Sequence, residues 1–345
     1  MSDSDNDWRP TATREALVHR AQALARVREF FAKCSVLEVD TPVVVNAPVT
    51  DVHVHSAEVR FPDAQGRYYL HTSPEFAMKR LLASGSGDIY QVCHVARGLE
   101  RGRQHNAEFT LIEWYRLGYS LEQLMDEVEA LAREVLGPVA KPMHSERVSY
   151  AEAFKTWLGI DPLAASIAEL RAAARDAGLT PRTPPPADEA GSAGNVTPPA
   201  REDDTAERDE LLEFLMGAKI GPMLGRNALT FVHRYPASQA ALARLDERDP
   251  RCALRFELYC EGIELANGFH ELASASEQRA RFKHDLAERR RRRLPADEMD
   301  ERLLGALQAG LPDCAGVALG FDRLLMLATG ASHIDEVMPF PIERA

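Results

Sequence analysis

Residues 261–272, EGIELANGFHEL, constrain the fold of this chain more than any other stretch. The segment is typical of a β-strand, yet it carries Glu264, Asn267 and Glu271 among apolar side chains. Two carboxylates in an apolar setting repel each other and resist desolvation unless a cation lies nearby. The segment therefore predicts a site for a cationic substrate, for a magnesium–nucleotide complex, or for both.

The bulk composition is that of an ordinary globular protein. The 345 residues are 45% hydrophobic and 27% charged, enough for two domains or one large domain with insertions. A net charge of −12 argues against broad, nonspecific binding of nucleic acid. The five cysteines are scattered without a CxxC pair, which is typical of a reducing cytosol and disfavours a thiolate zinc site. The N-terminus carries no signal peptide and no apolar run is long enough for a membrane span, so we expect a cytoplasmic protein.

The order of the predicted elements favours an α+β fold, a mixed and mainly antiparallel sheet flanked by helices. Residues 89–98 and 108–119 alternate like two antiparallel strands joined by a charged loop. Other strands are predicted within residues 36–45, 67–71, 229–236, 255–269 and 314–320. Helices are predicted within residues 13–33, 72–85, 121–136, 149–158, 276–293 and 321–330.

Residues 181–205 interrupt this pattern. They are rich in Pro, Gly, Ala and Asp and have almost no large apolar side chains, which predicts a flexible loop. Because strand-like segments resume beyond it, we interpret the loop as an insertion within one domain.

Arg97 ends a predicted strand and faces a loop that contains Arg101, Arg103 and His105. A guanidinium is planar and stays charged, so it can form two parallel hydrogen bonds to a phosphate or a carboxylate. The alternative is a surface hairpin whose charges are solvated and pair weakly.

Glu113 and Tyr115 lie two positions apart on a predicted strand, so their side chains project from the same face. A carboxylate beside a phenol suits an alkylammonium, which offers three donors and no acceptor. The alternative is a half-exposed strand with Glu113 in water.

Two further features leave alternatives open. Gly320 and Arg323 lie where a predicted strand meets a helix, and such junctions cradle phosphates or flat rings, although Arg323 could equally pair with a surface carboxylate. The arginine run 289–293 surrounds a helix end, which indicates either a solvated terminus or a docking patch for an acidic macromolecule.

Together these segments resemble the three signature motifs of class II aminoacyl-tRNA synthetases, in the expected order. Residues 36–42 with the helix before them resemble motif 1, residues 94–115 resemble motif 2, and residues 316–324 resemble motif 3. Residues 72–82 and 262–272 match the lysine branch of the family. The resemblance implies one catalytic domain over residues 11–345, a homodimer formed through motif 1, and ATP and Mg²⁺ as cofactors.

Two departures point to one branch of that family. Only about ten residues precede the helix leading into motif 1, so we expect no anticodon-binding domain, and Ala318 and His270 stand where the tRNA enzymes usually have glycine and serine. Both features resemble the truncated branch that activates (R)-β-lysine as an adenylate and attaches it to a lysine of translation elongation factor P. The resemblance implies elongation factor P as the partner and makes tRNA unlikely. A synthetase that charges tRNA or a minihelix, and a non-catalytic regulatory paralogue, are the alternatives.

The resemblance also implies roles for single residues. Arg97 and Arg323 would be catalytic, with Arg97 bridging the substrate carboxylate and the α-phosphate. The substrate would be bound by Ser73, Pro74, Glu75, Glu113, Tyr115, Asn267 and Glu271. Within this set Glu75 would hold the amino group near the carboxylate, Asn267 the carboxylate, and Glu113, Tyr115 and Glu271 the distal ammonium.

The implied nucleotide site has one departure from the family pattern. ATP would be bound by Arg97, Gly98, Leu99, Asn106, Phe109, Glu264, Leu265, Gly320 and Arg323, with the Phe109 ring stacked on adenine. Glu264 and Glu271 would hold Mg²⁺ against the phosphates. Families of this kind usually have Arg-Asn-Glu in motif 2, whereas Gly98 and Leu99 follow Arg97 here, so the acid of that motif is missing.

Overall fold

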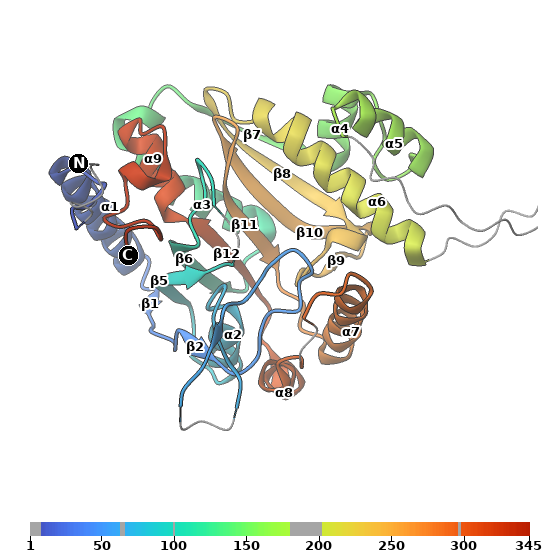
Figure 1. Cartoon of the computed structure of the whole chain (residues 1–345), viewed down its shortest axis with the longest axis horizontal. Helices are drawn as coiled ribbons and strands as arrows, with labels where there is room; N and C mark the ends of the chain where they lie inside the picture. Colours follow the sequence, from blue (N-terminus) through green and yellow to red (C-terminus); the bar gives the residue numbers. More distant parts are fainter. Residues whose placement is uncertain (1–7, 63–65, 99–100, 180–201, 296–297) are drawn as a thin grey trace, which may run out of the picture.

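A computed structural model describes residues 8–62, 66–98, 101–179, 202–295 and 298–345. The described residues form a nine-stranded sheet, in which strands far apart in the sequence lie side by side (Figure 1). Its order is β1 (Leu37–Glu38), β5 (Ile89–Ala96), β6 (Glu108–Leu117), β12 (Cys314–Gly320), β11 (Ile263–His270), β10 (Asp249–Cys260), β8 (Ala228–Pro236) and β7 (His144–Ser149), with β9 (Leu245–Asp246) paired to β10. The β1–β5 and β7–β8 pairs are parallel and the other pairs are antiparallel, which confirms the predicted α+β fold with a mixed, mainly antiparallel sheet.

Helices cover both faces of this sheet. Trp114 and Tyr115 are consecutive in β6 and therefore point to opposite faces. Trp114 packs in a core with α1 (Arg14–Lys33), α3 (Leu121–Leu136) and α9 (Phe321–Thr329). Tyr115 packs in a second core with α2 (Glu75–Ala83), α7 (Ala275–Arg291) and α8 (Glu301–Gly310). Of these helices, α8 was not predicted from the sequence.

A third group of helices lies at the end of the sheet away from α1 (Figure 1). It consists of α4 (Tyr150–Leu158), α5 (Ile167–Asp176) and α6 (Glu202–Leu215), and its core includes Tyr235 of β8. The predicted flexible loop therefore ends too late, because α6 begins at Glu202 rather than beyond residue 205. The rest of that loop, residues 181–201, lies outside the described residues.

Two predicted strands are wrong in their bounds. Residues 36–45 form two short strands on either side of Pro42, because proline cannot donate a ladder hydrogen bond. β1 joins the large sheet, whereas β2 (Val44–Val45) joins a small sheet with β3 (Glu58–Val59) and β4 (Tyr68–Leu70). Residues 255–269 form a hairpin of β10 and β11, because Glu261 and Gly262 both adopt positive φ angles (51° and 74°) that fit a tight turn.

The central strand β12 sets the positions of the predicted site residues. Glu113 of β6 pairs in register with Ala318 of β12, which in turn pairs with Asn267 of β11. Residues directly opposite each other project from the same face, so these three side chains form one row across three strands. Among the described residues, no helix combines the length and the apolar character needed to cross a membrane.

Candidate active site

A cavity opens at the junction of β5, β6, β11 and the start of α9. It brings together most of the side chains predicted to bind ATP. Its lining includes Arg97, Asn106, Phe109, Glu264, Leu265, Gly320 and Arg323. The cavity also reaches Asn267 and Ala318, so the predicted nucleotide site and the row of side chains on the sheet are continuous.

Arg97 faces this cavity, and among the described residues no carboxylate forms a salt bridge with it, although its charge opposes the rise in the pKa of Glu264. Its guanidinium lies 5.2 Å from the centre of the Phe109 ring, and its Nε donates to the carbonyl of Thr72 at 3.3 Å. The remaining N–H groups can therefore donate to an anion in the cavity. Gly98 lies beside Arg97 but does not line the cavity, because its N–H donates to the carbonyl of His55 at 2.8 Å. Leu99 lies outside the described residues.

Arg323 holds two walls of the cavity together. Its Nη1 donates to the carbonyl of Glu264 at 2.9 Å, and its Nε donates to the carbonyl of Gln104 at 3.2 Å. Its Nη2 lies 2.6 Å from Nε2 of His105. Because arginine has donors and no acceptor, Nε2 of His105 is the acceptor in this contact. An added Cβ at Gly320, at the N-terminal end of α9, would lie 3.7 Å from Cδ of Arg323, an ordinary van der Waals contact, so the Arg323 side chain does not require glycine there.

Asn106 builds the cavity wall. Its side chain is buried, its Nδ2 donates to the carbonyl of Glu108 at 2.6 Å, and its Oδ1 accepts from the N–H of Ile342 at 3.1 Å. Both ends of the amide therefore have protein partners. The predicted contact between Asn106 and ATP stays a prediction, and one amide hydrogen remains for it.

The C-terminal segment contacts the loop that follows Arg97. Arg101 forms two hydrogen bonds to Asp335, at 2.9 and 2.7 Å, and a third to Glu343 at 2.6 Å. The N–H of Ile334 donates to the carbonyl of Arg103 at 2.9 Å, and Ile334 itself lines the cavity. Sequence reasoning missed this contribution, because nothing in the local pattern pairs residues so far apart in the chain.

Glu113 is the centre of a second, buried part of the site. Its two carboxylate oxygens accept from the hydroxyls of Ser73 and Tyr115, each at 2.7 Å. Burial and then the neighbouring carboxylate of Glu75 raise the pKa of Glu113 to about 8, against the two hydrogen bonds. The pKa of Tyr115 is well above its usual value for the same reason, burial beside carboxylates.

Glu271 lies next to this pair and is held by a lysine that sequence reasoning missed. Nζ of Lys79 contacts Glu75 at 2.7 Å and Glu271 at 2.6 Å, and the Lys79 and Glu271 side chains are each 1% exposed. Burial alone would lower the pKa of Lys79, but the two carboxylates raise it above its usual value. Burial raises the pKa of Glu271 to about 7 despite the Lys79 charge. The signal for Lys79 was its position four residues after Glu75 on a predicted helix.

One oxygen of Glu271 remains without a donor. Oε1 is buried and accepts no hydrogen bond from a described residue. It lies beside the Tyr115 ring at Gly316, where an added Cβ would be 2.3 Å from the ring and 2.6 Å from Oε1. The absence of a side chain at Gly316 therefore lets the phenol and the carboxylate lie together. Pro74 and Ser73 begin α2, with Oγ of Ser73 accepting the N–H of Glu75 at 3.0 Å.

The structure does not bring Glu264 and Glu271 together. They lie at opposite ends of β11, and seven residues of extended chain span about 20 Å. Glu264 lines the cavity, where desolvation and the nearby Glu257 raise its pKa to about 7. Within the described ranges no group of three or more His, Cys, Asp or Glu side chains could hold a metal ion. A single ion shared by both carboxylates is therefore incompatible with this geometry, and the metal role of each one alone stays a prediction.

The arginine run 289–293 is not uniformly solvated. The Arg289 side chain is buried and donates to the carbonyls of Asp51 at 2.5 Å, Val54 at 3.2 Å and Pro295 at 2.6 Å. Arg292 pairs with Glu288 at 2.5 Å. The first arginine thus anchors the segment between β2 and β3, which neither interpretation of the run had anticipated.

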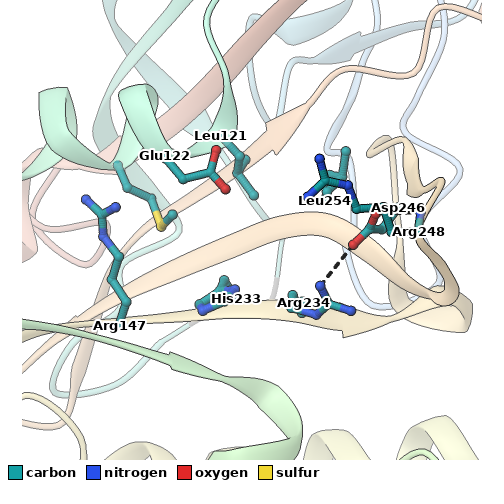
Figure 2. A pocket seen from close by; sticks show the side chains of 9 residues that line it. Leu121, Glu122, Arg147, His233, Arg234, Asp246, Arg248 and Leu254 are labelled. Atoms are coloured by element: carbon teal, nitrogen blue, oxygen red, sulfur yellow. Dashed lines mark hydrogen bonds and ion pairs between the residues drawn. The ribbon is translucent and has the colours of Figure 1, made fainter.

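A second cavity, of about 380 Å³, lies on the α3 side of the sheet (Figure 2). Figure 2 shows His233 between Arg147 and Arg234, with Leu121 and Glu122 of α3 above them. Arg234 pairs with Asp246 at 3.0 Å, and Arg147 pairs with Asp126 at 2.5 Å. None of the predicted site residues lines this cavity; carboxylates neutralise Arg147 and Arg234, and Arg248 is the third arginine of its lining.

Comparisons with known proteins identify the family of this chain and several relatives. A family model described as "tRNA synthetases class II (D, K and N)" matches residues 5–344. The protein named elongation factor P–(R)-β-lysine ligase in Vibrio vulnificus is 47% identical over 339 residues, which cover 97% of this chain and 98% of the relative. The proteins of the same name in Salmonella dublin and Pasteurella multocida are 45% and 44% identical and cover 98% and 100% of this chain, and the same shares of their own length.

Proposed function

Because the chain belongs to the class II tRNA synthetase family, in the group of the aspartate, lysine and asparagine enzymes, we propose that it activates (R)-β-lysine with ATP and transfers it to a lysine side chain of translation elongation factor P. Relatives of that name align with this chain over nearly its whole length. Family membership supports ATP as the activating nucleotide. We infer a single catalytic domain over residues 11–345, acting in the cytoplasm.

The charge balance of the buried site carries this proposal. In the described part of the chain, Glu75 and Glu271 both contact the buried Lys79, and Glu113 is within electrostatic reach of these two carboxylates. The carboxylates therefore outnumber the lysine by two, and β-lysine brings two ammonium groups. Oε1 of Glu271, which is buried without a donor, suits one of these groups beside Tyr115. A substrate with two positive charges would lower the raised pKa values of Glu113 and Glu271 by stabilising their ionised forms.

The first chemical step forms the adenylate. The substrate carboxylate attacks the α-phosphorus of ATP, one P–O bond forms, and the bond to pyrophosphate breaks. Arg97, which forms no salt bridge with a described carboxylate, would stabilise the negative charge that develops on the phosphate oxygens. Positioning and electrostatics suffice for such a transfer, so no covalent intermediate with the protein is required.

Mg²⁺ would neutralise charge on the phosphates of bound ATP. The donor set fits this ion through Glu264, because Mg²⁺ is commonly held by one carboxylate together with phosphate oxygens and water. For Glu271 we propose the ammonium contact in place of the metal, because Lys79 already compensates its charge in an enclosed site.

The second step forms an amide. The neutral ε-amine of the acceptor lysine attacks the carbonyl carbon of the adenylate, a C–N bond forms, AMP leaves with the C–O bond electrons, and one proton is released. The buried side of the site holds the ammonium groups of the bound β-lysine, so the electrophilic carbonyl would lie towards the cavity and Arg97.

Two assays test this function. Pyrophosphate exchange into ATP is measured with (R)-β-lysine and α-lysine side by side, and elongation factor P is weighed by mass spectrometry after incubation. We expect exchange that favours β-lysine and a mass gain of one β-lysyl group. No amino-acid-dependent exchange would indicate a non-catalytic paralogue, and label on tRNA without a mass gain on the factor would indicate a tRNA-charging enzyme.

A further inference from the structure

The side chain of Asn267 is oriented from outside the cavity by a buried arginine. Asn267 lines the cavity, and its Oδ1 accepts from Nε of Arg255 at 3.2 Å. Arg255 itself does not line the cavity and lies on the neighbouring strand β10. The hydrogen bond therefore acts on the site through the amide of Asn267, and the charge of Arg255 also opposes the rise in the pKa of Glu264.

Arginine has donors and no acceptor, which fixes the orientation of this amide. The oxygen of Asn267 must face Arg255, so its NH₂ group points away from the guanidinium, and in the described parts of the chain no acceptor takes either hydrogen. An amide without such a partner could rotate by half a turn and present an acceptor instead. Only the observed orientation offers a donor to an anionic group in the cavity.

Arg255 is held rigidly enough to exert this control. Its Nη2 donates to Glu257 at 2.5 Å, its Nη1 donates to the carbonyl of Gln239 at 2.7 Å, and its guanidinium lies 4.4 Å from the centre of the Tyr235 ring. Glu257 is fixed in turn by the hydroxyls of Tyr235 at 2.5 Å and Tyr259 at 2.7 Å. The planar guanidinium thus has a partner on every side, and it cannot swing away from Asn267 without leaving Glu257 unpaired.

We propose that Arg255 is a positioning residue that makes the site selective for the carboxylate of the substrate. It keeps the NH₂ group of Asn267 directed at that carboxylate and excludes the rotated amide, whose oxygen would repel it. The proposal rests on the proposed function, because it assigns the substrate carboxylate to Asn267. The ammonium-binding residues Glu113 and Glu271 take no part in this network.

The test compares ligands with and without a carboxylate. The KM for (R)-β-lysine is measured by pyrophosphate exchange, and 1,4-diaminopentane, which is β-lysine without its carboxylate, serves as a competitive inhibitor. In Arg255→Met we expect the KM for β-lysine to rise roughly ten- to hundredfold, the effect of one hydrogen bond to a charged group. The inhibition constant of the diamine should stay within about twofold of the wild type, because the diamine has no carboxylate for Asn267 to bind.

A double-mutant cycle shows whether Arg255 acts through Asn267. Asn267→Ala should raise the KM for β-lysine to a similar extent, and Arg255→Met should add nothing in that background. If Arg255→Met does not fold, the same cycle is run with Arg255→Lys, which keeps the positive charge beside Glu257 and loses the planar guanidinium.

Each outcome separates the inference from the proposed function. Weakening of β-lysine and the diamine by equal factors, full additivity in the cycle, or an unchanged KM for β-lysine would overturn the role of Arg255. Absence of β-lysine-dependent exchange in the wild-type protein would instead overturn the proposed function on which that role rests.

Discussion

Glu113 is the residue whose protonation the fold controls most directly. Its pKa of about 8 keeps most of the carboxyl protonated at neutral pH, whereas a bound ammonium favours the ionised form. We therefore expect kcat/KM for β-lysine to rise as the pH increases from about 6.5 to about 8.5. The measurement is a pH profile of pyrophosphate exchange at limiting β-lysine.

The variant Glu113→Gln is the control for this assignment. Glu271, with a pKa of about 7, remains in the variant, so the midpoint of the rise should move down towards 7 while the absolute rate falls. A midpoint that stays near 8 in Glu113→Gln would show that another group controls the profile.

Gly316 has no side chain, and the Tyr115 ring and the Glu271 carboxylate occupy the space where a Cβ would lie. In Gly316→Ala the new Cβ would meet the Tyr115 ring, so we expect a loss of about 1–3 kcal/mol in unfolding free energy and a large rise in the KM for β-lysine. Chemical denaturation and exchange kinetics measure the two effects. Gly305→Ala, in α8 with no atom within 4 Å of the new Cβ, should instead stabilise the protein by about 1 kcal/mol. Equal effects of the two substitutions would contradict this steric account.

Single residues could be predicted where the pattern is local. The alternation of side chains along β6 placed Glu113 and Tyr115 on one face, and the structure joins them by a 2.7 Å hydrogen bond. The partnership of Lys79 with Glu271 could not be predicted, because it forms only when α2 packs beside the end of β11. The metal prediction for Glu264 and Glu271 treated them as neighbours, although an extended strand separates them.

At the scale of elements, the buried Glu–Lys ion pair of α2 can be compared with an exposed Glu–Lys pair of the same spacing in α1. Lys79 pairs with Glu75 four residues earlier in a buried setting, and Lys33 pairs with Glu29 in the same spacing on the exposed side of α1. Lys79→Met leaves buried carboxylates uncompensated, so we expect a loss of roughly 3–5 kcal/mol in unfolding free energy. Denaturant titration should show no measurable change for Lys33→Met, and similar losses for both would contradict the role of burial.

The C-terminal segment is the second element that bears on the site. Arg101 binds Asp335 and Glu343, and this contact supports the loop that carries His105 and Asn106 into the cavity wall. In Arg101→Met we expect the KM for ATP to rise roughly two- to fivefold, the effect of partly exposed ion pairs, with the KM for β-lysine unchanged. Arg60→Met removes an exposed pair with Glu58 and is the control. Pyrophosphate exchange, with ATP and β-lysine varied in turn, measures both KM values. A raised KM for β-lysine with an unchanged KM for ATP would contradict this account and place Arg101 in the amino-acid site.

Elements could be predicted where their pattern is strong. The long helices α1 and α3 follow their predicted ranges closely, because each has one buried face. The β5–β6 pair also follows its predicted ranges, although both faces of β6 are buried. α5 was missed although Ser166 and Glu169 form a capping box, since its short apolar stripe is rich in alanine. β7 was missed because it is a largely exposed edge strand without alternation.

At the scale of the whole molecule, the exposed apolar side chains support the predicted dimer. Leu37 and Val43, in and beside the segment that resembles motif 1, are 56% and 46% exposed. We expect Leu37→Asp to shift the protein from dimer to monomer in light scattering after size exclusion, because it places a charge in an apolar interface. Val139→Asp, at a position 40% exposed between α3 and β7, is the control and should leave the mass unchanged. A wild-type protein that is monomeric would contradict the dimer itself.

The fold class could be predicted at this scale, because the motifs occur along the chain in the order typical of the family. The order of the strands in the sheet could not be predicted, because it depends on pairing between segments far apart in the chain.

The position of β12 between β6 and β11 has a consequence for how the protein folds. During synthesis β6 emerges early and β11 much later, and neither can complete its hydrogen bonds until β12 has been made and inserted between them. The binding surface is therefore assembled last, from contacts of high sequence separation. Until that moment the nascent chain exposes two unpaired strand edges, so interrupted synthesis before residue 314 would leave an aggregation-prone fragment rather than a partly active enzyme.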